Sequence, residues 1–289
     1  MFDVSLSNSG YSMYNVDNNI LHNVDGALYP FNPDWKRVGV NLSGGADSAV
    51  GVATLCKLIQ QSGADTEIVV LTNVRVWENR PWAAPISVEV YNKLREMFPD
   101  VQMQRVQGYI PPEIEDGTIG IIEQIGTSGD RITTRSFNKF AAYTYKLEAV
   151  YGFITNNPVA DDFQHPGQPY DRTWNADILK DNGSCPQYKG NSTPIQVYPW
   201  KLISKEFIMG QYLRNNWQDL LNITRSCEGD KALHQYRDPN PFVDYTEYQH
   251  GVTPLPTCND ITDVTEEKCF WCNEREWALN KARKIIDES

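Results

Sequence analysis

The sequence contains no uninterrupted run of about 18 apolar residues, the length that a membrane-spanning helix needs. Residues 1–5 also lack the basic and apolar segments of a secretory signal peptide. Basic residues are few, with 26 Lys and Arg against 37 Asp and Glu and a formal net charge of −11. This balance argues against the broad basic face that stable nucleic-acid binding needs. We therefore expect a cytoplasmic protein that does not span a membrane and does not bind nucleic acid stably.

The most informative stretch is residues 38–50, VGVNLSGGADSAV. It begins as a buried strand, breaks into a glycine-containing turn and continues from Ser48 with the apolar spacing of a helix. This order brings the N-terminus of a helix against an anion. Gly44 and Gly45 allow the backbone to approach a ligand closely, and the hydroxyls of Ser43 and Ser48 are potential donors to phosphate oxygens.

Asp47 lies in the same stretch, where a carboxylate would repel phosphates unless it helps to hold a bridging Mg²⁺ ion. The pattern Ser-Gly-Gly-x-Asp-Ser, residues 43–48, resembles the PP-loop of the ATP pyrophosphatases. That resemblance implies cleavage of ATP between its α- and β-phosphates, with adenylation of a substrate oxygen. The stretch is not a Walker A loop, because no Gly-Lys-Ser/Thr follows. The alternative is an ordinary glycine-rich turn between a strand and a helix.

Strand and helix patterns alternate after this turn. Strands are predicted at 67–74, 101–106, 151–155 and 194–199, and helices at 85–98, 134–149 and 204–215. The alternation predicts an α/β fold with a parallel sheet flanked by helices, and the PP-loop resemblance implies that this sheet is Rossmann-like (HUP-type). Because ligands of such sheets bind at the carboxyl ends of the strands, we expect Thr72 and Asn73 to lie near the nucleotide.

Three regions are predicted from the organisation of the chain. Residues 1–36 form an N-terminal extension, either a pair of leading strands or a polar arm; residues 37–225 form the nucleotide-binding α/β domain; and residues 226–289 form a C-terminal zinc-binding helical appendage that includes an insertion.

The six cysteines suggest a metal site rather than disulfides in a reducing compartment. Cys269 and Cys272 form a Cys-x2-Cys knuckle before a helix predicted at 274–286. With Cys227 and Cys258 they provide four thiolates, which suit a tetrahedral structural Zn²⁺ site. Cys185 is an alternative fourth ligand, and a redox pair at Cys269 and Cys272 is an alternative role. Cys56, in the middle of a helix, is expected in the core.

Several further segments follow the order found in 7-cyano-7-deazaguanine synthases, and the chain resembles that family between about residues 37 and 283. The matching positions are Arg135 with Glu148 and Ala149, Asn157 with Asp161, Pro199 with Ser204, Lys205 and Glu206, the run Thr224 to Cys227, and Cys272 with Arg275.

This resemblance implies an enzyme that uses ATP and Mg²⁺ to adenylate 7-carboxy-7-deazaguanine and then adds ammonia, giving the amide and, after a second activation, the nitrile. It implies that Asp47, Lys205 and Arg135 are catalytic, that Asn157 contacts the nucleotide and that the zinc is structural. It also implies a homodimer, since the family often forms dimers.

The sequence departs from the family pattern in two places. Thirty residues, 228–257, separate Cys227 from Cys258, and Glu266 stands where the family's compact cysteine cluster begins. The segment after Asn157 also lacks the family's usual element. A relative that acts on another carboxylate or on a protein terminus is therefore an alternative.

Two other functions remain open. A tRNA sulfurtransferase can be built on the same loop, although the acidic balance and the C-terminal position of Cys269 and Cys272 count against it. The non-enzymatic alternative is a nucleotide-binding module whose loop has no catalytic activity. The intact Ser43, Asp47 and Ser48 count against it.

Overall fold

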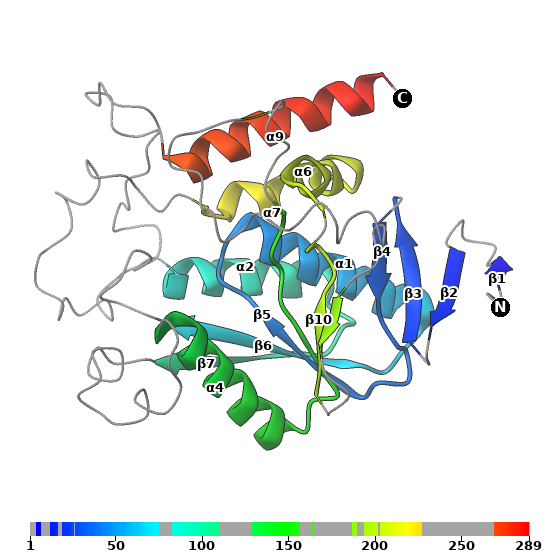
Figure 1. Ribbon diagram of the computed structural model, residues 1–289, viewed down its shortest axis with the longest axis vertical. Helices are drawn as coiled ribbons and strands as arrows, with labels where there is room; N and C mark the ends of the chain where they lie inside the picture. Colours follow the sequence, from blue (N-terminus) through cyan, green and yellow to red (C-terminus); the bar gives the residue numbers. More distant parts are fainter. Residues whose placement is uncertain are drawn as a thin grey trace, which may run out of the picture.

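The computed structural model describes residues 4–6, 12–16, 19–25, 27–74, 83–109, 129–156, 163, 187–189, 194–201, 203–226 and 269–288 (Figure 1). None of the helices in this part of the chain is long and apolar enough to cross a membrane.

A six-stranded sheet forms the centre of the molecule. Its strands, in the order in which they lie side by side, are β7 (Met103–Tyr109), β6 (Glu67–Val74), β5 (Arg37–Asn41), β8 (Ala149–Tyr151), β10 (Ile195–Tyr198) and β9 (Gln187–Lys189). The first five are parallel, and β9 is antiparallel at the edge. The chain moves outward from β5 to β7 and then returns to β8 on the other side of β5. This is the doubly wound order of a Rossmann-like fold, as the alternation predicted.

Helices cover both faces of this sheet (Figure 1). The helices are α1 (Ala46–Ser62), α2 (Ala83–Met97), α4 (Gly129–Tyr145), α6 (Lys205–Arg214), α7 (Gln218–Ile223) and α9 (Phe270–Asp287). Along β6, Ile68 and Val70 pack into the cluster that contains α1, whereas Val69 and Leu71 pack with α4. A strand buried on both faces alternates between two apolar environments, which explains its continuous hydrophobic run. Helix α9 packs on α6, outside α1 (Figure 1).

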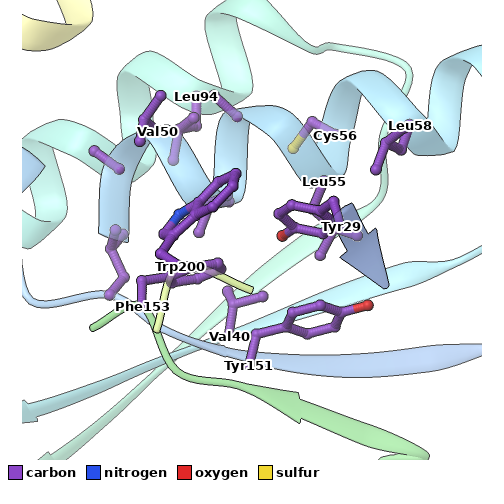
Figure 2. Close-up of a cluster of buried hydrophobic side chains, with 14 of the residues drawn as sticks. Tyr29, Val40, Val50, Leu55, Cys56, Leu58, Leu94, Tyr151, Phe153 and Trp200 are labelled. Carbon is purple, nitrogen blue, oxygen red and sulfur yellow. The ribbon is translucent and has the colours of Figure 1, made fainter. Parts of the chain in front are cut away.

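The core around α1 is rich in aromatic rings (Figure 2). Tyr29 lies edge-on to Trp200, with 5.1 Å between ring centroids, and stacks with Tyr151 at 5.8 Å. Cys56 is fully buried in this cluster, which confirms its prediction as a core residue.

The N-terminal segment forms its own antiparallel sheet. Its strands are β1 (Val4–Leu6), β2 (Ser12–Val16), β3 (Asn19–Val24) and β4 (Ala27–Pro30), paired in sequence order. The Tyr29 hydroxyl donates to the Gly51 carbonyl of α1 at 3.0 Å, and the Tyr151 hydroxyl donates to the Pro30 carbonyl at 2.8 Å. The sequence suggested a strand pair or a polar arm here. The four strands form a meander instead, and its last strand is buried against the central domain.

The predicted end of one helix is wrong, and the strand that follows it is shifted with it. The helix expected at 134–149 ends at Tyr145, because Lys146 takes a positive φ of 55° and the Leu147 N–H turns back to the Ala142 carbonyl. The Glu148 N–H then bonds the Arg37 carbonyl, and Ala149 already belongs to β8. The strand expected at 151–155 is therefore shifted towards the N-terminus. The boundary between α4 and β8 is decided by the pairing of β8 with β5. This pairing joins residues far apart in the sequence, so no local pattern indicates it.

Candidate functional site

Residues 42–45, the glycine loop, connect β5 to α1. Gly44 has a φ of +82°, which favours glycine. A Cβ atom at Gly44 would lie 2.8 Å from Cγ2 of Ile86 and 3.1 Å from the backbone nitrogen of Ser87. The loop therefore needs glycine at this position both for its turn and for its close packing against the start of α2.

Two serines brace the glycine loop from the inside. The Ser48 hydroxyl donates to the Gly45 carbonyl at 3.0 Å and accepts the Ser43 N–H at 3.3 Å. Ser48 is buried, whereas Ser43 is exposed. Of the two hydroxyls predicted to donate to phosphates, that of Ser43 is open to a ligand and that of Ser48 already holds the loop.

The N-terminus of α1 has no side-chain cap among the described residues. Gly45 is its N-cap residue and provides no side-chain acceptor for the first-turn amides. The helix has 17 residues, and the partial positive charge of its dipole lies at this end. The Gly45 N–H makes a long contact of 3.4 Å to the Ser43 hydroxyl. These N–H groups are the donors that bind phosphates at helix N-termini.

Asp47 and Lys205 form an ion pair at this helix end. The Lys205 Nζ atom lies 2.5 Å from Oδ1 of Asp47, and the side chains are 2% and 21% exposed. The hydroxyl of Thr155 lies 3.5 Å from the other oxygen of Asp47. The three residues come from α6, α1 and the segment after β8. A buried ammonium group is costly unless it is paired, so the pair fixes where α6 begins relative to α1.

These groups gather at the switch point of the sheet. Strands β5 and β8 are neighbours, and the chain leaves β5 and enters β8 through helices on opposite faces. The glycine loop follows the carboxyl end of β5, and Thr155 follows that of β8. Ligands of doubly wound sheets bind in the crevice outside such a pair of strand ends.

The two predicted residues on β6 differ in their surroundings. Thr72 is fully buried, and its hydroxyl donates to the Leu42 carbonyl at 3.0 Å, so it supports the glycine loop. The amide nitrogen and oxygen of Asn73 are buried without a hydrogen-bond partner in the part of the chain that the structure describes. An unpartnered buried amide at a strand's carboxyl end is consistent with a residue that contacts a ligand. That Thr72 and Asn73 contact the nucleotide remains a prediction.

Cys269 and Cys272 lie at the start of α9. The helix begins at Phe270, four residues earlier than expected, with Cys269 as its N-cap. The Cys272 N–H therefore donates to the Cys269 carbonyl at 3.0 Å. Within the described ranges, no three His, Cys, Asp or Glu side chains gather as metal ligands.

Several predicted residues lie outside the described part of the chain. Asn157, Cys227, Cys258 and Cys185 are not among the described residues, and Arg135 is placed in α4 without a described side chain. The zinc site and the roles of Arg135 and Asn157 therefore stay predictions.

Sequence reasoning missed Tyr212 and Thr155. The Tyr212 hydroxyl donates to the Ala46 carbonyl in the first turn of α1 at 2.7 Å. Burial raises the pKa of Tyr212, which keeps its phenol neutral. Tyr212 follows Lys205 by seven positions, so helical spacing already places them on one face of α6. Thr155 could have been found from its position after a strand at the carboxyl edge.

Comparison with known proteins gives the following. No protein-family model matches the chain, and no curated protein sequence matches it. Among solved structures, a U34-tRNA thiolase, NcsA, from Methanococcus maripaludis with its [4Fe-4S] cluster aligns with a TM-score of 0.39 and 12% identity, covering 88% of this chain and 73% of that one. NAD⁺ synthetase from Burkholderia pseudomallei aligns with a TM-score of 0.34 and 13% identity, covering 88% and 82%. Both TM-scores are below 0.5, so neither likeness carries an argument about activity.

Proposed function

We propose that this protein binds ATP at the glycine loop and transfers AMP to an acceptor oxygen, releasing pyrophosphate. The observation that carries the proposal is the Lys205–Asp47 pair, with Lys205 fully buried, beside the uncapped N-terminus of α1 at the switch point of the sheet. The pattern of residues 43–48, which resembles the PP-loop, supports cleavage between the α- and β-phosphates.

The residues of the site suit a polyphosphate. The first-turn amides of α1 and the exposed hydroxyl of Ser43 are donors to phosphate oxygens. Asp47 keeps 21% of its side chain exposed, and its oxygen facing Thr155 makes a long contact of 3.5 Å with the Thr155 hydroxyl. That oxygen fits the first coordination shell, or the bound waters, of a Mg²⁺ ion, which would neutralise phosphate charge. The positive charge of Lys205 offsets the negative charge of Asp47 beside the place where the phosphates would bind.

The acceptor that we propose is a carboxylate, with 7-carboxy-7-deazaguanine as the first candidate from the resemblance. A carboxylate oxygen attacks the α-phosphorus, the bond to the oxygen bridging to the β-phosphorus breaks, and pyrophosphate leaves with that oxygen. Ammonia then attacks the acyl carbon, AMP leaves and one proton is released. The activation is needed because a carboxylate oxygen is otherwise a poor leaving group.

The test is a product assay. Purified protein is mixed with ATP, magnesium, ammonium and 7-carboxy-7-deazaguanine, and pyrophosphate, AMP and modified base are measured. We expect amide or nitrile with stoichiometric AMP in the wild type and none with Asp47→Ala. Asp219→Ala is the matched control, because Asp219 is an exposed acid on α7.

Each other outcome has a definite meaning. AMP and pyrophosphate without modified base would contradict the proposed acceptor and keep the adenylation. Turnover that depends on tRNA and a sulfur donor would establish the sulfurtransferase alternative. No AMP with any acceptor would overturn the proposed function in favour of a nucleotide-binding module.

We also propose that Cys227, Cys258, Cys269 and Cys272 hold a structural Zn²⁺ ion. Support comes from the two cysteines that are described, Cys269 and Cys272, which lie three positions apart at the start of α9 as in a Cys-x2-Cys knuckle. We expect about one zinc per chain by elemental analysis of the purified protein and loss of the metal in the Cys269→Ser/Cys272→Ser variant, with Cys56→Ser as the control. Stoichiometric iron and sulfide, or full metal content in the double variant, would contradict this site.

A further inference from the structure

Arg275 of α9 is linked to the glycine loop through one peptide group. Its two terminal nitrogens donate to the carbonyls of Thr224 and Leu221, each at 2.8 Å. Those carbonyls lie at the C-terminal end of α7, where a cation is favourable. Burial lowers the pKa of Arg275, and the charges of the nearby Tyr212, Cys272 and Asp47 oppose that shift.

The peptide group that joins Thr224 to Arg225 contacts both Arg275 and the glycine loop. Its carbonyl accepts from Arg275, and its N–H, on Arg225, donates to the Gly44 carbonyl at 3.0 Å. The carbonyl and N–H of a trans peptide point in opposite directions. The 224/225 peptide therefore connects a guanidinium on one side to the glycine loop on the other.

The peptide group that joins Gly44 to Gly45 continues this connection in the same way. The Gly44 carbonyl and the Gly45 N–H belong to one peptide group, so a bond that holds the carbonyl also fixes the direction of the N–H. The Gly45 N–H has a long contact of 3.4 Å to the Ser43 hydroxyl, which a stronger acceptor would displace. Hydrogen-bonded amides in series polarise one another, and a cation at the start strengthens the last donor.

We propose that Arg275 is a positioning residue that orients and polarises the Gly45 N–H for an anionic ligand through the 224/225 and 44/45 peptide groups. This inference rests on the proposed function for the identity of the ligand, a phosphate of ATP. It also assigns a role to α9: the start of this helix, with Cys269 and Cys272, is joined to the glycine loop although it is far away in the sequence. The C-terminal position of these cysteines therefore does not separate them from the site.

The first test reads the Gly45 amide directly and needs no ATP. The full chain is labelled with [¹⁵N]glycine, and the Gly45 resonance is identified by its loss in Gly45→Ala. Arg275→Gln should move the Gly45 amide resonance, whereas that of Gly63, at the other end of α1, should stay in place. Arg283→Gln is the matched control, because Arg283 is exposed on the same helix. An unchanged Gly45 resonance in folded Arg275→Gln would overturn the inference.

The second test measures binding of α,β-methylene-ATP by calorimetry. Loss of a hydrogen bond chain that starts at a charged group should raise the Kd about tenfold in Arg275→Gln. Arg275→Lys keeps the charge but cannot bridge both carbonyls, so its Kd should lie between those of the wild type and Arg275→Gln; it also replaces Arg275→Gln if that variant fails to fold. A merely structural role would lower the melting temperature of both variants equally and leave the Kd unchanged, which would overturn the inference.

The two tests separate the inference from the proposed function. If the wild type does not bind α,β-methylene-ATP, the proposed function fails, while a shifted Gly45 resonance in Arg275→Gln would still establish the link. If the wild type binds the analogue and Arg275→Gln binds it equally well with an unmoved Gly45 resonance, the inference fails alone.

Discussion

The two ends of the central sheet have the same kinds of residues in different surroundings. At the carboxyl end, Gly44 and the Lys205–Asp47 pair adjoin the start of α1; at the amino end, Gly63 caps the end of α1, and Arg37 pairs with Glu67 at 2.6 Å. The Arg37 and Glu67 side chains are 38% and 20% exposed, whereas Lys205 is 2% exposed.

The amino-end pair has partners that account for it structurally. Arg37 also donates to the Tyr145 carbonyl at 2.9 Å, and Gln104 donates to Glu67 at 2.6 Å, so the pair ties together the starts of neighbouring strands. The carboxyl-end pair instead joins two helices and a loop around an open helix N-terminus. An ion pair of a given residue type therefore does not by itself mark a ligand site. A buried ion pair beside the uncapped N–H groups at the start of a helix is what marks one. Matched substitutions at the two ends test it.

The largest expected effect is on catalysis. Asp47→Asn keeps the size of the side chain and removes its charge, so Lys205 loses its carboxylate partner and the first turn of α1 loses its acidic residue. Loss of one preorganised electrostatic group should lower the rate of pyrophosphate release about 100- to 1,000-fold at saturating ATP. Glu67→Gln, at the amino end, should change the rate by no more than about twofold. Equal losses in the two variants would remove the distinction between the ends.

The second largest expected difference between the two ends of the sheet is in the free energy of unfolding. Lys205→Met leaves Asp47 without its cation, and breaking a buried pair costs about 3–5 kcal/mol. We expect the lower end of that range, because Asp47 retains some contact with water. Arg37→Met should cost about 1 kcal/mol, as for exposed pairs. Urea denaturation measures both, and Lys205→Met/Asp47→Asn should recover part of the loss without recovering activity. Equal stability losses at the two ends would contradict the comparison.

The two glycines give a smaller contrast. Both have a positive φ, +82° at Gly44 and +66° at Gly63, so alanine costs about 1–2 kcal/mol at either position. A Cβ atom at Gly63 meets nothing within 4 Å, whereas one at Gly44 meets Ile86 at 2.8 Å. We therefore expect Gly63→Ala to lower the urea midpoint only, and Gly44→Ala to lower it further and abolish binding of α,β-methylene-ATP. Undiminished binding by Gly44→Ala would show that the loop does not contact the nucleotide.

The smallest effect concerns pH and the N-terminal sheet, which leads into the amino end of β5. Burial lowers the pKa of His22, and a bond between its Nε2 atom and the Phe31 carbonyl, 3.1 Å long, opposes that shift. Below pH 6.5 the unfolded chain takes up a proton that the folded His22 resists, so this contribution to stability is present above pH 6.5 and is lost as the pH falls below it. Urea midpoints at pH 7.5 and 5.5 should therefore differ more in the wild type than in His22→Gln. An equal difference would exclude His22 as the cause.

Local signals in the sequence were reliable where a few neighbouring residues decide the backbone. The strand predicted at 67–74 is confirmed. Gly63 ends α1 as its C-cap with a φ of +66°, and its N–H donates to the Gln60 and Ile59 carbonyls, as is usual for a glycine in this position. The helix predicted at 204–215 is confirmed within one residue at each end, with Ser204 as the N-cap of α6 and no capping bond from its side chain. The helix expected at 134–149 failed at its end, because sheet pairing takes Ala149 away from the helix.

The site was predictable only in part for the same reason. Resemblance singled out Asp47 and Lys205, but nothing in the sequence showed that these side chains, 158 positions apart, would pair with each other. Thr155 and Tyr212 gave no motif, because each contributes a single hydroxyl from a different element. The link from Arg275 to Gly44 runs through backbone groups, which every residue has, so no residue type could signal it.

The sequence by itself determined the glycine loop between a buried strand and a helix, because apolar spacing and two glycines act over a few residues. Only the tertiary structure decided what surrounds that loop: Lys205 against Asp47, the hydroxyl of Thr155, and the Arg225 N–H on the Gly44 carbonyl. These contacts depend on the order β7-β6-β5-β8-β10 and on the packing of α6 and α7 beside α1, since those two features bring the distant segments to one end of the sheet.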